Sequence, residues 1–266
     1  MEIKTTRLMP VESRLETIHR PKAVLDLRGL IMHAYHGSRD PDAILAADGR
    51  TLVKRASFGL FAFSERYLAP LFEKFAPIDV VCVKEGGNDI RRAIYPEYKA
   101  KRAKEKEAQD PRLTEQLSLL ISGVEKLMAN LGCTMIEVPK VEADDVIAMI
   151  CHRYPGNVLV HTRDADLAPL ACLPNTVVML GENLVEPEEP ITLDGLPVLP
   201  RHVTLYKALV GDSSDEYPGV KGVGPAAWQS LVKTYQDEAL AGIEKAIMAD
   251  NRAEVLEAAN QYGDKV

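Results

Sequence analysis

Short apolar runs rich in β-branched residues alternate with longer stretches of helical spacing through the first two thirds of the chain. The apolar runs are Lys22–Leu27, Asp79–Val83, Cys133–Val138, Val158–His161 and Thr176–Leu180. Between them, helical spacing covers Leu52–Phe75, Leu113–Leu131 and Asp144–Tyr154, and each stretch is long enough to cross a sheet face. Strands that alternate with such helices are typical of a mostly parallel sheet flanked by helices. The sequence therefore predicts an α/β fold.

The character of the sequence changes after Leu180. Two segments rich in Gly, Pro and acidic residues, GENLVEPEEP and LDGLPVLP, are typical of a connection across the surface. A mostly helical tail is predicted beyond them. We place a boundary near Pro190, which divides the chain into a catalytic α/β domain over residues 1–190 and a C-terminal region over residues 191–266.

Composition favours a soluble protein with a sizeable core, because 46% of the 266 residues are hydrophobic. No run approaches the roughly 18 apolar residues of a membrane helix, and the N-terminus lacks the apolar segment of a signal peptide. The four cysteines are widely spaced and form no CxxC pair, so we expect reduced core thiols rather than disulfides or a zinc site. These patterns predict a cytoplasmic protein with no membrane partner.

One strongly basic segment, RRAIYPEYKAKRAKEK, runs from Arg91 to Lys106. Its seven basic and two acidic residues give it a local charge of +5. A run of this kind is often only a solvated helix face. Here Tyr95 and Tyr98 are interleaved with the cations, and aromatic rings can stack on bases while cations follow phosphates. We therefore interpret the segment as a nucleic-acid surface.

Nine acidic residues fall at the ends of predicted strands, at the starts of helices or in a glycine-rich loop. Because the carboxyl ends of parallel strands converge on one edge of a sheet, where ligands bind, we expect most of these carboxylates to meet. The nine are Asp26, Glu85, Glu142, Asp144, Asp145, Asp164, Asp166, Asp212 and Asp215.

Such a cluster needs cations, because buried charges must be paired or bind metal. Carboxylate oxygens suit Mg²⁺ or Mn²⁺ rather than zinc. Nine carboxylates exceed the needs of one ion, so the sequence predicts two ions that clamp the attacking water and the leaving oxygen of a phosphodiester. Glu142 and Asp145 are spaced to share a helix face, whereas Asp144 points elsewhere. We expect the carboxylate of Asp145 to point toward the second ion.

Each acid also has a simpler interpretation. Asp144 and Asp145 can complement the positive end of a helix dipole, Asp164 can cap a helix, and Asp212 can shape a turn. Taken singly, these simpler interpretations are favoured. Taken together, they require a series of coincidences that one metal-binding edge does not.

The C-terminal region carries GVKGVGPAAW directly after GDSSDEYP. Gly222, Val223 and Gly224 fit a tight hairpin between two helices, where backbone amides at a helix N-terminus can bind a phosphate. The segment also matches the loose pattern GxGxxA, but no predicted strand precedes it, which argues against a dinucleotide site. The sequence contains no GxxxxGK[ST] loop, so it gives no support for ATP-driven activity.

Four motifs resemble the 5′ nucleases in their order along the chain: YPEYKAKR, VEADDVIA, TRDADL and GDSSDEYPGVKGVGP. That family includes bacteriophage 5′-3′ exonucleases, flap endonucleases and the 5′-nuclease domain of bacterial DNA polymerase I. The resemblance extends over roughly residues 22–235. It implies a PIN-like catalytic domain, a basic helical arch at about residues 88–110, and a C-terminal helix-three-turn-helix, or helix-hairpin-helix, element that grips duplex DNA.

The resemblance also implies two metal sites and a basic catalytic group. The first site would comprise Asp26, Glu85, Glu142 and Asp144, and the second Asp145, Asp164, Asp166, Asp212 and Asp215, partly through water. Lys99 would contact the scissile phosphate, assisted by Arg91 or Arg92.

DNA contacts and a potassium ion are implied as well. The arch would bind DNA through Tyr95, Tyr98, Lys101, Arg102 and Lys104, and the hairpin through Lys221, Gly222 and Gly224. Potassium would lie at Val220, Gly222 and Val223.

The chain departs from the family pattern without losing a carboxylate. Glu85 stands where Asp is usual, so its carboxylate reaches one methylene further. His33 falls where an arginine is common, which leaves the role of this position open. Leu27 replaces a glycine, and Glu216 with Tyr217 replaces a frequent Asn-Ile pair.

The sequence thus predicts a monomeric, metal-dependent 5′-3′ exonuclease with flap endonuclease activity. Its substrates would be 5′ ends, overhangs or flaps of DNA, or of an RNA–DNA hybrid, during replication or recombination, in the host cytoplasm if a phage encodes it. Two alternatives stay open: an RNase H-like primer-removing or RNA-processing nuclease, and a non-catalytic module that binds DNA by its structure.

The net charge of −7 fits this interpretation. Setting aside the nine clustered carboxylates changes the balance to +2, and the basic segment alone carries +5. An acidic total therefore combines a metal-binding pocket with a basic strip that faces the substrate.

Overall fold

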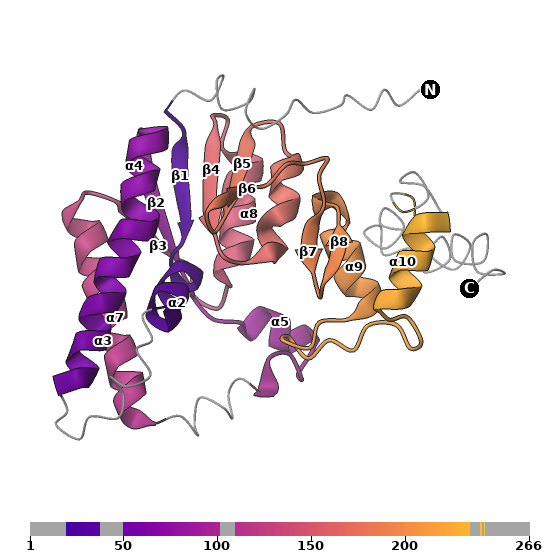
Figure 1. Cartoon of the computed structure of the whole chain (residues 1–266), viewed down its shortest axis with the longest axis horizontal. Coiled ribbons are helices and arrows are strands. Elements are labelled where there is room, and N and C mark those ends of the chain that lie inside the picture. Colours follow the sequence, from indigo (N-terminus) through magenta and orange to yellow (C-terminus); the bar gives the residue numbers. More distant parts are fainter. Residues whose placement is uncertain (1–19, 38–49, 102–109, 235–239, 241, 243–266) are drawn as a thin grey trace.

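The computed structural model describes residues 20–37, 50–101, 110–234, 240 and 242, and a mixed sheet lies at its centre (Figure 1). The strands follow the order β3-β2-β1-β4-β5-β6, in which β6 (Asn183–Leu184) is antiparallel to its neighbour. The parallel strands are β1 (Lys22–Asp26), β2 (Asp79–Lys84), β3 (Thr134–Glu137), β4 (Val158–Thr162) and β5 (Thr176–Leu180). The predicted α/β class and its five strands are confirmed.

Helices cover both faces of this sheet (Figure 1). One face carries α2 (Leu27–Gly37), α3 (Arg50–Phe63), α4 (Ala69–Phe75) and α7 (Pro111–Asn130), with a π-helical turn at Ser64–Leu68 between α3 and α4. The other face carries α8 (Ala143–Arg153), the 3-10 segment η3 (Ala165–Cys172) and α9 (Val203–Val210). The three predicted helical stretches correspond to α3 with α4, to α7 and to α8.

The side chains of β1 alternate between two apolar cores. Ala23 and Leu25 pack in the cluster beneath α2, α3 and α7, whereas Val24 packs in the cluster beneath α8 and η3. Successive strand residues point to opposite faces, so an apolar run buries the strand on both sides. Each fully buried Val or Leu stabilises the fold by about 1.5–3 kcal/mol. This double burial fixes the register of β1 and hence the position of Asp26 at its end.

The strand order reverses at β1, which pairs with β2 on one side and β4 on the other. In open α/β sheets, ligands bind at such a reversal, outside the carboxyl ends of the strands. Asp26 ends β1, Glu85 follows β2 and Asp164 follows β4. The topology therefore brings these three carboxylates to one edge.

Helix α2 is an element that the strand pattern did not predict. It begins immediately after β1, because Asp26 caps it: Oδ1 accepts the backbone N–H of Gly29 at 3.1 Å. Its buried residues, Leu27, Leu30, Ile31, Ala34 and Tyr35, have the spacing of one helix face.

The segment LDGLPVLP corrects one prediction, because it forms a hairpin rather than a surface connection. Strands β7 (Ile191–Leu193) and β8 (Leu196–Val198) are joined by Asp194 and Gly195, with φ of 49° and 78°. An Asp-Gly pair readily adopts this left-handed backbone, which matches the twist of a hairpin.

The rest of the described part of the C-terminal region includes a 3-10 turn (Pro200–His202), α9 and α10 (Pro225–Thr234). Val198, Tyr206 and Trp228 lie in the same apolar cluster as Val24 of the sheet. The described part of this region therefore shares a core with the sheet, and the boundary near Pro190 stays a prediction.

No helix in the described part of the chain is both long and apolar enough to span a membrane. All four cysteines are free thiols, as predicted. Cys82 and Cys151 are buried, and burial raises their pKa values to about 12 and about 11. These two thiols are therefore protonated groups of the core.

Candidate active site

Asp26 anchors the site at the end of β1. Its side chain is 5% exposed, and Oδ2 accepts a hydrogen bond from the Thr162 hydroxyl at 2.8 Å. A Cβ at position 29 would lie 2.2 Å from the same oxygen, so Gly29 leaves the space that the carboxylate occupies. Burial raises the pKa of Asp26 although both hydrogen bonds oppose it. The carboxylate is therefore held in one orientation.

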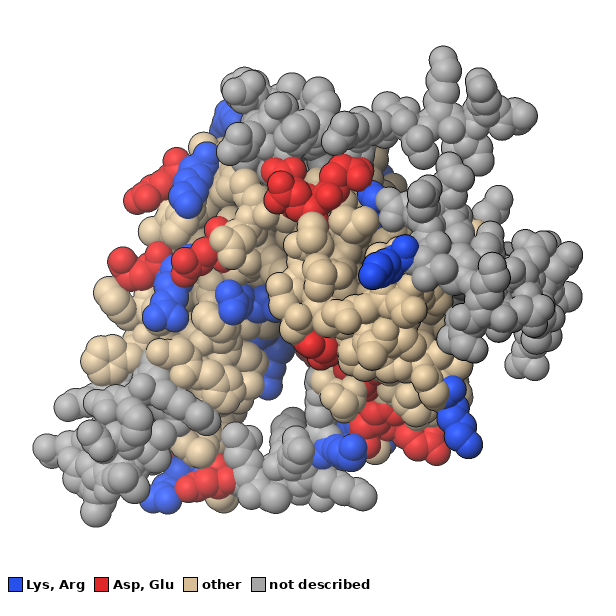
Figure 2. All heavy atoms as spheres, turned by 45° about the vertical axis from the view of Figure 1, so that its right-hand side comes forward, with Lys and Arg blue, Asp and Glu red and all other residues tan. Residues whose placement is uncertain are grey.

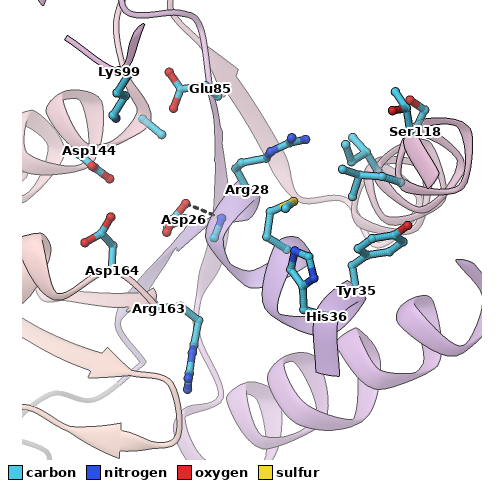
Figure 3. A pocket seen from close by; sticks show the side chains of 16 residues that line it. Asp26, Arg28, Tyr35, His36, Glu85, Lys99, Ser118, Asp144, Arg163 and Asp164 are labelled. Carbon is cyan, nitrogen blue, oxygen red and sulfur yellow. Dashed lines mark hydrogen bonds between the residues drawn. The ribbon is translucent and has the colours of Figure 1, made fainter. Parts of the chain in front are cut away.

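A cavity of about 1020 Å³ opens beside Asp26 (Figure 3). Asp26, Glu85, Asp144 and Asp164 line one end of it, and Lys99 enters the same end from the basic segment. Burial, followed by the charges of Asp164, Asp26 and Asp166, raises the pKa of Asp144 to about 8. Carboxylates that oppose one another's ionisation form a site that a divalent cation would stabilise.

A second carboxylate group consists of Asp166, Asp212 and Asp215, each of which offers an oxygen within 4.8 Å of the other two. Lys207 of α9 forms an ion pair with Asp166 and lies 2.6 Å from Oδ2 of Asp212. Burial favours the neutral form of Asp212, but hydrogen bonds from Lys207 and Ser214 prevail and lower its pKa to about 2. The donor set is all carboxylate oxygen, which fits a hard divalent cation.

Arg91 joins Glu142 to Asp145. Its Nε lies 2.9 Å from Oε2 of Glu142, and its Nη2 lies 2.8 Å from Oδ1 of Asp145. The predicted shared helix face of Glu142 and Asp145 is thus present, while Asp144 lines the cavity. Whether Asp145 takes part in a second metal site stays a prediction.

Lys99 holds its ammonium group among the carboxylates. Its Nζ lies 2.6 Å from Oε1 of Glu142 and 3.6 Å from Oδ1 of Asp215. Burial works against its charge, but these acids and the Tyr98 hydroxyl raise its pKa, so Lys99 is a cation at neutral pH. Its backbone has φ of 52°, a left-handed conformation that is costly for a residue with a Cβ and is concentrated at functional sites.

The structure corrects the prediction that Tyr98 stacks on bases. This residue is only 7% exposed, and its hydroxyl lies 2.8 Å from Oε2 of Glu142 and 3.1 Å from Oδ2 of Asp215. The hydroxyl also accepts a hydrogen bond from Nη1 of Arg91 at 3.0 Å. Tyr98 therefore positions charged groups, and its ring is not available to a base.

The basic segment begins within α5 (Asp89–Ile94), and its first residues are docked on the turn at residues 212–217 (Figure 1). The backbone N–H of Lys99 donates to the Asp215 carbonyl at 3.3 Å, and the Tyr95 hydroxyl donates to the Glu216 carbonyl at 2.9 Å. The carboxylate of Glu216 accepts the backbone N–H of Lys101 at 2.6 Å. Glu216, one of the departures from the family pattern, thus contributes to this docking.

Most of the other predicted catalytic and DNA-binding residues of the basic segment and the hairpin are exposed or lie outside the described residues. Arg92 is exposed, and the side chain of Lys101 is 73% exposed. Lys221 is exposed beside Gly222, whose φ of 89° requires glycine. The residues that lie outside the described ranges are Arg102 and Lys104.

The glycine-rich turn corrects the expected arrangement of the C-terminal hairpin. Its backbone closes where the N–H of Val223 donates to the Val220 carbonyl at 3.0 Å, directly before α10. Helix α9 already ends at Val210, because Gly211 adopts φ of 99°. The two helices are therefore joined by the whole of residues 211–224, and the potassium site and DNA contacts expected there stay predictions.

Figure 2 shows acidic and basic side chains side by side along the lower edge of the face it presents. On that face Lys and Arg are dispersed rather than gathered into one field. Charges of the two signs are therefore mixed on that face.

The sequence of residues 22–192 matches the family of the 5′-3′ exonuclease N-terminal resolvase-like domain. A 5′-3′ exonuclease of Aquifex aeolicus is 30% identical over 207 residues, which cover 71% of this chain and 68% of that protein. A 5′-3′ exonuclease of Bacillus subtilis is 32% identical over 178 residues, which cover 64% of this chain and 57% of that protein.

The chain belongs to the 5′-3′ exonuclease family. The resemblance to the 5′ nucleases is thus confirmed, and the family places the chain among nuclease enzymes. This 5′-3′ exonuclease chain also shares the fold of the 5′-exonuclease of bacteriophage T5 in a structure with bound zinc, with a TM-score of 0.56 and 17% identity over 90% of this chain and 84% of that one. A T5 flap endonuclease in complex with DNA and metal ions has the same TM-score, with 16% identity over 91% of this chain and 85% of that one.

Two polar residues of this 5′-3′ exonuclease were not predicted from its sequence. Thr162 bonds Asp26 and accepts the backbone N–H of Asp164 at 2.9 Å, so it ties β1 to β4. Its position could have indicated it, because Thr162 directly follows the predicted strand Val158–His161 and lies two residues before Asp164. Lys207 lies on an ordinary helical stretch, and no local pattern distinguishes it.

The simpler interpretations of two acids also hold in the 5′-3′ exonuclease. Asp164 caps η3, since Oδ1 accepts the N–H of Asp166 at 2.9 Å. Asp212 shapes its turn by accepting the N–H of Ser214 at 2.8 Å. These local bonds orient each carboxylate, and they are compatible with metal binding through the remaining lone pairs.

Proposed function

We propose that this chain is a divalent-metal-dependent 5′-3′ exonuclease and flap endonuclease that hydrolyses phosphodiesters near the 5′ ends of DNA. The observation that carries the proposal is the meeting of Asp26, Asp144 and Asp164 in one cavity, next to the group of Asp166, Asp212 and Asp215. Relatives named 5′-3′ exonucleases, and a fold shared with a flap endonuclease, support it.

Two Mg²⁺ or Mn²⁺ ions are proposed as cofactors. One would be held by Asp26, Glu85, Glu142 and Asp144, and the other by Asp145, Asp164, Asp166, Asp212 and Asp215, partly through water. When bound, such ions would supply an acidified water and neutralise charge on the leaving oxygen. The raised pKa of Asp144 supports the fit, because a nearby dication favours the ionised carboxylate.

The chain's own cations would complete the chemistry. Lys99 lies among the carboxylates and lines the cavity, so its ammonium group can donate to a phosphate oxygen as charge develops there. Arg91 holds Glu142 and Asp145 in place, and Arg92 is exposed nearby on α5 for a contact to the strand.

The substrate is proposed to be DNA with a 5′ end, overhang or flap, with an RNA–DNA hybrid as a second class. The basic segment would form an arch over the cut strand, and α9 with α10 would grip the duplex as a helix-three-turn-helix element. A potassium ion at Val220, Gly222 and Val223 would support the turn before α10. The protein is proposed to act as a monomer in the cytoplasm.

The proposal is tested with a DNA flap labelled at its 5′ end and incubated with Mg²⁺ or with EDTA. Cleavage with Mg²⁺ and none with EDTA is expected, and product lengths separate single-nucleotide release from flap removal. Binding without cleavage under both conditions would instead support a non-catalytic DNA-binding module. A matched flap with an RNA 5′ strand distinguishes a preference for primers, since faster cutting of RNA would favour the RNase H-like alternative.

A further inference from the structure

Two arginines that line the cavity beside Asp26 have no acidic partner among the residues that the structure describes. Arg28 lies in the first turn of α2, and Arg163 lies between β4 and η3; both side chains are exposed. Within the described ranges neither forms an ion pair, whereas Arg91, Lys99 and Lys207 each pair with carboxylates. Unpaired cations on a concave wall are available to an anionic ligand.

The backbone on both sides of Arg163 is fixed relative to the carboxylates. Thr162 donates to Asp26, and its hydroxyl accepts the N–H of Asp164. Space for the guanidinium group is left by Gly181, since a Cβ there would lie 2.0 Å from Nη1 of Arg163. The guanidinium group thus lies against Gly181, on a backbone that is fixed beside the carboxylates.

Arg163 also supplies charge on a side of α2 where the sequence lacks it. His33 stands where the family resemblance leads us to expect an arginine, and its Nδ1 bonds the hydroxyl of Tyr67. Burial, then the charges of Arg163 and Arg66, lowers the pKa of His33, so this histidine is neutral at neutral pH. Positive charge next to His33 is therefore carried by arginine side chains from other elements.

The remaining walls of the cavity suit a nucleotide. Met32 of α2 and Leu117 and Ile121 of α7 provide apolar surface, and Thr114 and Ser118 of α7 provide hydroxyl groups. Figure 3 shows Arg28 and His36 on α2, to the right of Asp26, and Arg163 projecting downward below Asp164. A nucleotide combines an anionic phosphate with base faces that pack on apolar surface.

We propose that Arg28 and Arg163 bind phosphates of unpaired nucleotides on the 5′ side of the bond that is cut, while Met32, Leu117 and Ile121 receive their bases. The inference rests on the proposed function, which assigns the duplex to α9 and α10. Those helices and α2 with α7 lie on opposite sides of the sheet's carboxyl edge (Figure 1). A strand that passes the carboxylates from the duplex therefore enters this cavity with its 5′ portion.

The test compares binding of two DNA duplexes, one without a tail and one with a short single-stranded 5′ tail, with Ca²⁺ in place of Mg²⁺ to prevent cutting. Arg28→Ala and Arg163→Ala are each expected to weaken binding of the tailed duplex about 5–10-fold and to leave the untailed duplex unchanged. Each substitution should also lower the slope of log affinity against log salt concentration for the tailed duplex by the amount expected for about one phosphate contact. Arg163→Lys should restore part of the loss.

A matched control is Arg153→Ala, which removes the same charge from an exposed position at the far end of α8, about 14 Å along the helix from Asp144. Neutral methylphosphonates in the tail should weaken wild-type binding by the same factor as the substitutions. On the methylphosphonate duplex, the Arg28→Ala/Arg163→Ala protein should bind with the same affinity as wild type. Melting temperatures confirm that all variants fold.

The inference would be overturned if the substitutions weakened binding of the tailed and untailed duplexes equally. It would also be overturned if the double variant bound the methylphosphonate duplex more weakly than wild type by the full factor seen on the ordinary tail. In either case the proposed function would stand if wild type still cuts with Mg²⁺. Failure of wild type to cut either duplex would overturn the proposed function and the inference with it.

Discussion

The ammonium group of Lys99 lies 2.6 Å from Oε1 of Glu142, which joins the basic segment to the residue that precedes α8. The contact places a cation beside carboxylates that otherwise repel one another. It is made possible by the left-handed backbone of Lys99 and by the docking of its N–H on the Asp215 carbonyl. The position of Lys99 is therefore set by the fold as well as by charge.

Replacing Lys99 with Met should lower the rate of cleavage with little change in substrate affinity. The ammonium group is expected to act on charge that develops in the transition state, so kcat should fall about 10²–10³-fold. Steady-state kinetics on a labelled flap measure both constants. Lys74→Met is the control, because that side chain is exposed in the last turn of α4 and has no role in the site; equal effects of the two substitutions would contradict the role assigned to Lys99.

Lys207 should compete with metal for the second carboxylate group. Its ion pairs with Asp166 and Asp212 neutralise charge that a divalent cation would otherwise compensate. Lys207→Met is therefore expected to bind Mn²⁺ about 5–10-fold more tightly without DNA, measured by calorimetry. Lys233→Met, on the exposed surface of α10, should leave the affinity unchanged, and weaker Mn²⁺ binding by Lys207→Met would oppose this account.

Asp144 should make the metal-free protein less stable as pH rises. Its pKa is raised on folding from 3.8 to about 8, so stability is full below about pH 4 and is lost as pH rises toward 8. In EDTA, Asp144→Asn should raise the melting temperature by roughly 2–8 °C near pH 8, corresponding to about 1–2 kcal/mol. Added Mg²⁺ should narrow the difference in melting temperature between the variant and wild type. A variant that melts below wild type in EDTA at pH 8 would contradict this.

His161 should destabilise the fold in acid. It is fully buried, and burial lowers its pKa from 6.5 to about 4, although a hydrogen bond with the Gly181 carbonyl opposes this. Stability is therefore present above about pH 6.5 and is lost as pH falls toward 4, with about 2 kcal/mol lost between pH 7 and pH 5. In urea unfolding, His161→Gln should lose less free energy of unfolding than wild type between pH 7 and pH 5. An equal loss in both proteins would show that His161 is not the source of the acid sensitivity.

The sheet could be predicted because each strand carries its own signal. Apolar residues at successive positions of β1, β2 and β4 require burial on both faces, and that requirement fixed both fold class and strand ends. Carboxylates at those ends then had to meet. The hairpin of β7 and β8 was missed although Asp194 and Gly195 form a recognisable turn, because proline and acidic residues around it suggested a surface connection.

Partnerships within the site could not be predicted, because they join segments far apart in sequence. Tyr98 looked like a stacking residue among cations, yet packing against Glu142 and Asp215 buries it. Lys207 had no local signal, and its importance follows only from the distance to Asp212. Arg28 and Arg163 stand out only because they line the cavity and form no ion pair with another described residue.

The central claim is that the clustered carboxylates cut DNA through bound metal, and Asp212→Asn tests it most directly. Cleavage of a labelled 5′ flap in Mg²⁺ should fall at least about 10²-fold, while binding of the same flap by fluorescence anisotropy stays within about twofold of wild type. If Asp212→Asn instead cuts at the wild-type rate in Mg²⁺, and EDTA abolishes cleavage by both proteins, this carboxylate group does not carry the reaction.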